Sequence, residues 1–168
     1  MKYIAPIFLV CSMGLFLASV ALPAFCAGCT EREGQICYPY TGIFLLLCGW
    51  FGALATGWHA GLTWLANPLL IMAWILQIAW ITTRFPTRAF VVLVVSFALS
   101  ALAVILSASF LLLHKIETNP LAGGFTELIH IRHLGYWLWF SSTIMMFVGN
   151  CIQMIVLAFN KSVCHGTK

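Results

Sequence analysis

Residues 87–113 read TRAFVVLVVSFALSALAVILSASFLLL, and this stretch decides the fold class. No Asp, Glu, Lys or Arg interrupts it between Arg88 and Lys115. Apolar side chains occupy both odd and even positions, whereas a strand of a membrane barrel alternates apolar and polar residues. Roughly 20 apolar residues are enough for a helix to cross a bilayer core of about 30 Å. The stretch therefore predicts a membrane-spanning α-helix from about Thr87 to Leu113.

The composition of the whole chain indicates that lipid is its main solvent. Of its 168 residues, 62% are hydrophobic and 7% are charged, whereas soluble domains carry about 25% charged residues. In lipid every backbone polar group needs a partner within the protein, which leaves helices or a closed barrel. The net charge of +4 is too small and too scattered for a nucleic-acid surface. We therefore predict a single transmembrane domain over residues 1–168 that contacts the lipid bilayer and no nucleic acid.

Other apolar segments predict further helices, with approximate bounds of 3–25, 41–57, 68–83 and 134–159. The first segment follows Lys2, and a cleaved signal peptide is the alternative interpretation of it. Its apolar run is long for a signal peptide, and no clean Ala-x-Ala cleavage site follows. We therefore favour a retained first helix.

The region 41–83 is apolar throughout, but as one helix it would be about twice as long as the bilayer core is thick. Gly57, Gly61 and Asn67-Pro68 mark a break in it. Asn67 suits an N-cap, and Pro68 suits the first position of a helix. We therefore expect 41–57 to be a short or re-entrant helix. The predicted fold is an all-α integral membrane helical bundle with four spans and a re-entrant or short extra helix, and five spans is the alternative.

The basic residues predict the orientation of the four-span arrangement. One side would carry Lys2, Arg84, Arg88, Lys161 and Lys168. The other side would carry Arg32, Lys115 and Arg132. Because positive charge accumulates on the cytoplasmic side of membrane proteins, both termini and the Arg84–Arg88 turn are expected in the cytoplasm.

Five different short motifs are spread over most of the chain. They are LPAF at 22–25, CGWFG at 48–52, WLANPLL at 64–70, GGFT at 123–126 and GYWLW at 135–139. In these motifs the chain resembles a family of small, uncharacterised bacterial multi-span inner-membrane proteins, although the cysteine-rich first loop is not part of that pattern. The motifs are of the packing or boundary type rather than chemical signatures. The resemblance implies a multi-pass protein of the bacterial inner membrane and no known activity.

Three cysteines, Cys26, Cys29 and Cys37, fall in the predicted first external loop. Cys26-x-x-Cys29 has the spacing of a redox motif, and an oxidising compartment would let two of the three pair. The four-span disulfide-generating proteins of the bacterial inner membrane also place a Cys-x-x-Cys in their first external loop. The second cysteine pair of those proteins has no counterpart here, because residues 114–133 contain no cysteine. We therefore favour a structural disulfide, with a thiol–disulfide oxidoreductase as the enzymatic alternative.

Glu127, His130 and His133 follow one another at intervals of three residues. On a helix this spacing would place neighbours on one face, and two imidazoles with a carboxylate could hold zinc or iron. A polar collar at the lipid–water boundary is the plainer interpretation, and we favour it because no fourth ligand is evident. A metal- or haem-binding membrane protein is therefore the third hypothesis.

Small residues and amides mark expected contacts between helices. Ala53, Gly57 and Gly61 recur every four residues, a spacing that lets two helix backbones approach closely. Helix-packing roles are also expected for Asn67 and Pro68. The amides inside the predicted spans are those of Gln77, Asn150 and Gln153, and such groups usually join membrane helices by hydrogen bonds.

No nucleotide-binding loop, zinc-protease motif or serine-hydrolase motif occurs in the sequence. We therefore favour a non-enzymatic protein without a cofactor. It would act through contact with another membrane protein, as an accessory subunit or an immunity-type factor, or through a homo-oligomer.

Overall fold

The computed structural model describes the chain except for residues 1–3, 28–37, 56–61, 83–85, 119–124 and 166–168. The long helices are α1 (Ile4–Ala21), α4 (Ala66–Thr82), α5 (Pro86–Ser109) and α6 (Leu134–His165). A shorter helix, α2 (Gly42–Ala55), and a 3-10 turn, η1 (Phe110–Leu112), accompany them. The strands are β1 (Pro23–Ala27), β2 (Tyr38–Thr41), β3 (Lys115–Thr118) and β4 (Phe125–Arg132).

The predicted all-α membrane fold class is confirmed. Three helical segments are long and apolar enough to cross a membrane, namely Leu62–Thr82, Phe90–Leu112 and Leu134–Phe159. Helix α1 is apolar and slightly shorter, since its 18 residues reach about 27 Å. The small sheet is a minor addition to a helical protein.

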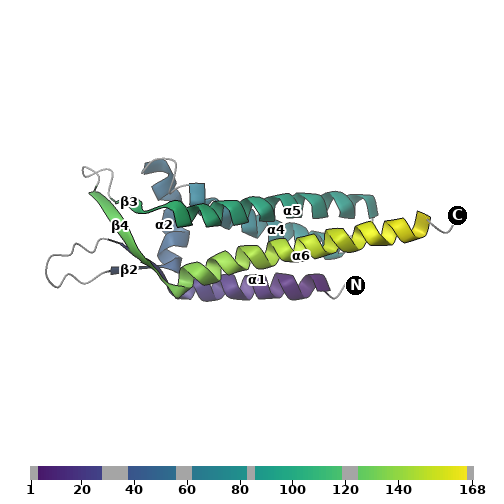
Figure 1. Ribbon diagram of the computed structural model, residues 1–168, viewed down its shortest axis with the longest axis horizontal. Helices are drawn as coiled ribbons and strands as arrows, with labels where there is room; N and C mark the ends of the chain where they lie inside the picture. The colour runs from purple at the N-terminus through teal and green to yellow at the C-terminus, as the bar shows by residue number, and fades with distance from the viewer. Residues whose placement is uncertain (1–3, 28–37, 56–61, 83–85, 119–124, 166–168) are drawn as a thin grey trace.

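The four long helices lie side by side along the longest axis of the molecule (Figure 1). Helix α1 packs mainly against α6, α4 packs mainly against α5, and α5 and α6 join the two pairs. Helices α1 and α5 run toward the sheet, whereas α4 and α6 run away from it, so α1 begins at the end of the bundle where α6 finishes. The sheet and this pair of chain ends therefore lie at opposite ends of the bundle.

Helix α2 is the short extra helix of the predicted arrangement. Figure 1 shows it crossing the sheet end of the bundle rather than running along it. Its 14 residues give a length of about 21 Å, less than the thickness of a bilayer core. Leu45 and Leu46 pack inward, whereas Ile43, Phe44 and Leu47 are exposed.

A four-stranded antiparallel sheet occupies the two segments that the sequence indicates only as loops. The strand order is β2-β1-β4-β3, so the segment after α1 pairs directly with the segment before α6. Cys26 in β1 is aligned with Pro39 on one side and with Ile131 on the other. The sheet thus ties together segments that are far apart in sequence.

The first helix is shorter than predicted, because α1 ends at Ala21 rather than near Phe25. Pro23 explains this difference: it lacks a backbone N–H, and it disfavours the helical conformation of the preceding residue. The Leu22 N–H closes a final turn on the Ser19 carbonyl, and β1 begins at Pro23. Apolar character alone therefore overestimated the helix by one turn.

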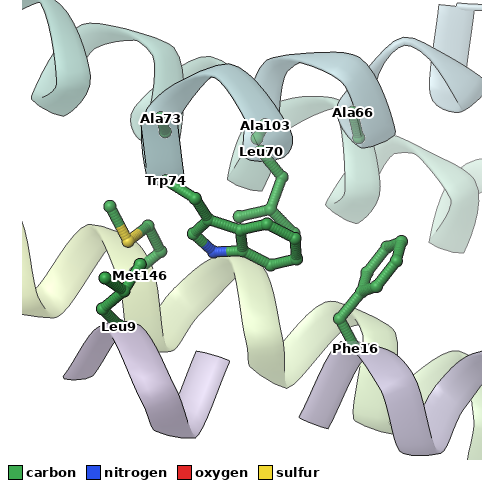
Figure 2. Close-up of a cluster of buried hydrophobic side chains, with 8 residues drawn as sticks. All are labelled: Leu9, Phe16, Ala66, Leu70, Ala73, Trp74, Ala103 and Met146. Atoms are coloured by element: carbon green, nitrogen blue, oxygen red, sulfur yellow. The ribbon is translucent and has the colours of Figure 1, made fainter. Parts of the chain in front are cut away.

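The hydrophobic core has two parts. The first lies within the bundle, where Figure 2 shows Leu70 and Trp74 of α4 pointing toward Leu9 and Phe16 of α1 and Met146 of α6. The rings of Phe16 and Trp74 meet edge to face at 5.3 Å between centroids, a favoured aromatic arrangement. The second part joins the bundle to the sheet, and its buried members are Ala24, Phe25, Phe110 and Tyr136.

The surface of the bundle is apolar, whereas its interior contains many small polar groups. The outward side chains Val10, Leu17, Ile105 and Ile155 are all more than half exposed. The polar side chains buried inside include those of Ser12, Ser96, Ser100, Ser107, Ser142, Thr143 and Asn150. Exposed apolar groups are stable in lipid, where small and polar residues form the contacts between helices.

Candidate functional site

The cysteine cluster is only partly described. Cys26 lies in β1, is buried at 4% exposure and is not disulfide-bonded. Cys29 and Cys37 lie outside the described residues. A buried thiol that packs as a small apolar group is poorly placed for exchange with a partner disulfide. The environment of Cys26 is therefore that of a core residue.

The proposed alignment of Glu127, His130 and His133 rested on a helix, and this part of the interpretation is wrong. Glu127 and His130 belong to strand β4, and His133 lies between β4 and α6. The His133 backbone N–H donates to the Ala24 carbonyl at 2.8 Å, which extends the contact between β1 and β4. Within the described ranges, no group of three His, Cys, Asp or Glu residues is arranged to hold a metal ion.

Of the expected helix-packing residues, Asn67 has a defined partner. Its Oδ1 accepts a hydrogen bond from the Trp139 Nε1–H of α6 at 2.8 Å. The predicted N-cap role of Asn67 is wrong, because α4 already begins at Ala66 and the Leu69 N–H donates to Leu65. Pro68 lies in the first turn of α4, where its missing N–H has no intrahelical partner to lose.

The other expected packing positions carry less information. Ala53 belongs to α2, whereas Gly57 and Gly61 lie outside the described residues. The close helix packing predicted from their four-residue repeat therefore stays a prediction.

A hydrogen-bonded group in the middle of the bundle joins three helices. The Asn150 side-chain amide of α6 donates to the hydroxyls of Ser100 at 3.0 Å and Ser96 at 3.2 Å, both on α5. The Ser96 hydroxyl in turn donates to the Ala73 carbonyl of α4 at 3.0 Å. The expected role of Asn150 as a contact between helices is confirmed.

A second hydrogen-bonded group connects α1 with α4 and α6. The Trp74 Nε1–H donates to the Ser12 hydroxyl at 3.0 Å, and that hydroxyl donates to the Ser142 carbonyl at 2.8 Å. Nearer the sheet, the hydroxyls of Ser107 and Thr143 lie 3.1 Å apart. The sequence spacing of Ser96, Ser100 and Ser107 could have indicated one polar face of α5.

Close backbone approach also holds α1 against α6. Gly149 lies beneath the ring of Phe8, and a Cβ atom at that position would come within 2.6 Å of the Phe8 Cβ. Glycine is thus required there by space, because any side chain would push the two helices apart.

Arg132 stabilises the 3-10 turn η1, which follows α5 at the junction with the sheet. One terminal nitrogen of its guanidinium, Nη2, donates to the carbonyl oxygens of Phe110, Leu111 and Leu113 at 2.9–3.2 Å. The Phe110 carbonyl also accepts from the Leu113 N–H. Carbonyls at the end of a helix generally lack intrahelical partners, and a cation is favoured at the negative end of the helix dipole. The sequence alone suggested only an orientation-setting charge at this position.

The outward face of α1 carries small residues bordered by larger apolar ones. Gly14, Ala18 and Ala21 are all exposed, and a Cβ atom placed at Gly14 would meet nothing within 4 Å. Val10 and Leu17 border these small residues at 66% and 67% exposure. The inward face of the same helix carries Ser12 and Phe16, whereas these small residues are exposed.

Comparisons of the chain with protein-family models, with curated proteins and with solved structures find no match.

Proposed function

We propose that this protein is a non-enzymatic component of the bacterial inner membrane that acts by lateral contact with another membrane protein. The observation that carries this proposal is the exposed stripe Gly14, Ala18 and Ala21 on α1, which we call the α1 stripe. Gly14 and Ala18 have three residues between them, a spacing of small residues that allows a second helix to approach closely within a bilayer.

The composition of the α1 stripe supports a contact surface rather than a purely lipid-facing one. Glycine in a helix interior is less favourable than alanine by roughly 1 kcal/mol. No neighbouring side chain of the described bundle needs the space at Gly14. A partner helix seated on the α1 stripe supplies a reason for glycine there, whereas lipid chains do not.

The interior of the bundle supports a structural role for its polar groups. The side chains of Ser12, Ser96 and Asn150 form their hydrogen bonds with neighbouring helices. These contacts fix the helices relative to one another, and they therefore fix the position of the α1 stripe on the surface of the bundle. The buried, unpaired Cys26 does not favour the thiol–disulfide alternative.

The proposed orientation places the sheet outside the cytoplasm. The start of α1 and the end of α6 lie at the same end of the bundle. The end of α4 and the start of α5 also lie there. In the sequence these points lie next to Lys2, Arg84, Arg88 and Lys161. The positive-inside rule assigns such an end to the cytoplasm.

Site-specific photo-crosslinking in intact cells tests the proposal. A photoreactive amino acid at Val10 or Leu17 is expected to form a crosslinked adduct of defined mass with a different membrane protein. The same amino acid at Ile105, on the exposed face of α5, is the matched control and is expected to give none. Adducts of equal yield at all three positions, or none at any, would contradict the proposal.

Bulky substitutions in the α1 stripe provide a second test within the photo-crosslinking experiment. Ala18→Leu is expected to abolish the adduct formed from Val10, because the larger side chain fills the space that a partner helix needs. Ala98→Leu makes the same change at an exposed position of α5 and is expected to leave it intact. An adduct with the mass of two copies of this chain would instead identify a homo-oligomer and overturn the assignment to a different protein.

A further inference from the structure

Two glutamine side chains in the bundle carry buried polar atoms without hydrogen-bond partners. Both polar atoms of the Gln77 amide, Nε2 and Oε1, are unpartnered among the described residues, and so is Oε1 of Gln153. Gln77 is 1% exposed and Gln153 is 6% exposed. Membrane interiors provide no general solvent to pair with such atoms, so a specific partner is required.

The register of the helices predicts that the two amides lie at one level. The Ser96 hydroxyl contacts both Ala73 of α4 and Asn150 of α6. Gln77 follows Ala73 by four residues, and Gln153 follows Asn150 by three, so each lies one turn further along the same face of its helix. Because α4 and α6 both run away from the sheet (Figure 1), the two turns extend in the same direction.

The remaining two helices close this level with apolar groups. Leu93 of α5 precedes Ser96 by one turn on an antiparallel helix and is fully buried. On α1, Phe8 packs at Gly149, which brings the buried Ala5 level with Gln153. The register therefore predicts a leucine and an alanine beside the amides, and neither side chain can accept or donate a hydrogen bond.

The unpartnered atoms comprise two acceptors, the oxygens of Gln77 and Gln153, and one donor group, the Gln77 Nε2. A direct bond from Gln77 Nε2 to the Gln153 oxygen would leave the Gln77 oxygen without a donor. One water molecule donates two hydrogens and accepts at least one, and buried waters typically form about three hydrogen bonds. We infer that a single water molecule is bound between Gln77 and Gln153, donating to both side-chain oxygens and accepting from the Gln77 amide.

Solid-state NMR of the full chain in lipid bilayers tests this site. Only Gln35, Gln77 and Gln153 are glutamines, so protein labelled with ¹⁵N at the glutamine side chains gives few signals. Gln77→Met and Gln153→Met, each close in volume to glutamine, assign the two bundle amides by loss of a signal. After bulk-water magnetisation has been suppressed, the Gln77 amide is expected to receive magnetisation from a water proton.

The variants also separate bound water from a direct amide pair. In Gln153→Met, the water-to-Gln77 transfer is expected to fall by at least half, because one of the water's three partners is removed. Ala98→Met, which changes an exposed position of α5, is the matched control and leaves the transfer unchanged. A wild-type spectrum with transfer from the Gln77 amide to the Gln153 side-chain carbonyl, and none from water, would overturn the inference. If a variant fails to fold, correlation of each glutamine side-chain amide with its own backbone signals in uniformly labelled wild-type protein supplies the assignment, and the wild-type measurement still decides the question.

Discussion

Single polar side chains inside the bundle act as specific connectors between helices. Asn150 bonds two serines of α5, and one of these, Ser96, reaches on to α4. Each such bond is modest in a membrane, because the unfolded chain also finds polar partners there. Their value therefore lies in fixing which faces of the helices meet as much as in stability.

Asn150→Leu is expected to lower the free energy of unfolding by about 1 kcal/mol, since it removes two hydrogen bonds but keeps the volume of the side chain. Ser96 retains its bond to Ala73, so no complete loss of folding is expected. Equilibrium unfolding in mixed detergent micelles measures the change. A variant as stable as the wild type would show that these bonds contribute nothing.

Cys26 is expected to resist modification in the folded protein, because it is buried between β2 and β4. In a background where all other cysteines are serine, a membrane-impermeant maleimide should label Cys26 only after denaturation. His114→Cys at an exposed position in a cysteine-free background is the positive control. Rapid labelling of native Cys26 would revive the thiol–disulfide hypothesis.

At the scale of elements, the strongest constraints act where two helices, or a helix and the sheet, meet. Helix α6 contacts Phe8 of α1 closely at Gly149, and the Arg132 side chain binds the carbonyls of η1 after the end of α5. The first contact depends on the absence of a side chain, and the second depends on a planar cation. Both can be tested by single substitutions.

Gly149→Ala is expected to destabilise the protein by about 1–3 kcal/mol, because the added methyl group would overlap Phe8. The double variant Phe8→Ala/Gly149→Ala should lose less stability than the sum of the two single variants. A double-mutant cycle on the free energy of unfolding checks this coupling. Simple additivity would mean that the two residues do not pack together.

Arg132→Met is expected to lower the free energy of unfolding by about 2 kcal/mol, since the three carbonyls at the end of α5 lose a charged donor. Arg132→Lys keeps the charge and should recover only part of this loss, because an ammonium group lacks the planar geometry of guanidinium. Hydrogen exchange of the backbone amides at the end of α5 provides a local measurement. Equal protection in all three proteins would contradict the capping role.

At the scale of the whole molecule, the arrangement of the helices predicts a definite topology. Four long helices run along the bundle and α2 crosses its end, so the start of α1 and the end of α6 lie together, opposite the sheet (Figure 1). Combined with the basic residues beside those chain ends, this arrangement predicts that the end opposite the sheet faces the cytoplasm. The α1 stripe then lies in the half of α1 nearer the sheet.

Reporter fusions check this topology. Alkaline phosphatase fused after His114 is expected to be active, because that point should lie outside the cytoplasm. The same enzyme fused after Arg84 should be inactive, whereas a fluorescent protein at the C-terminus should fluoresce. Activity of the Arg84 fusion would reverse the proposed orientation without changing the fold.

The sequence by itself determined the helical membrane class and the approximate positions of the long helices. An apolar run such as 87–113 needs only its own length and composition to require a helix in lipid, which is a local property. Pro23 shows the limit of that rule, because a single residue ended α1 where apolar character continued.

Only the tertiary structure decided the sheet, the binding of Arg132 to the carbonyls of η1, and the hydrogen-bond partners of Asn150. Phe25 pairs with Arg132, and Asn67 pairs with Trp139, across long stretches of chain. Their local sequences contain no signal for these partners, because strand pairing and contacts between helices depend on how the four helices are stacked. Glu127, His130 and His133 illustrate the same reason: their spacing suggested a helix, whereas pairing with distant strands made the segment part of a sheet.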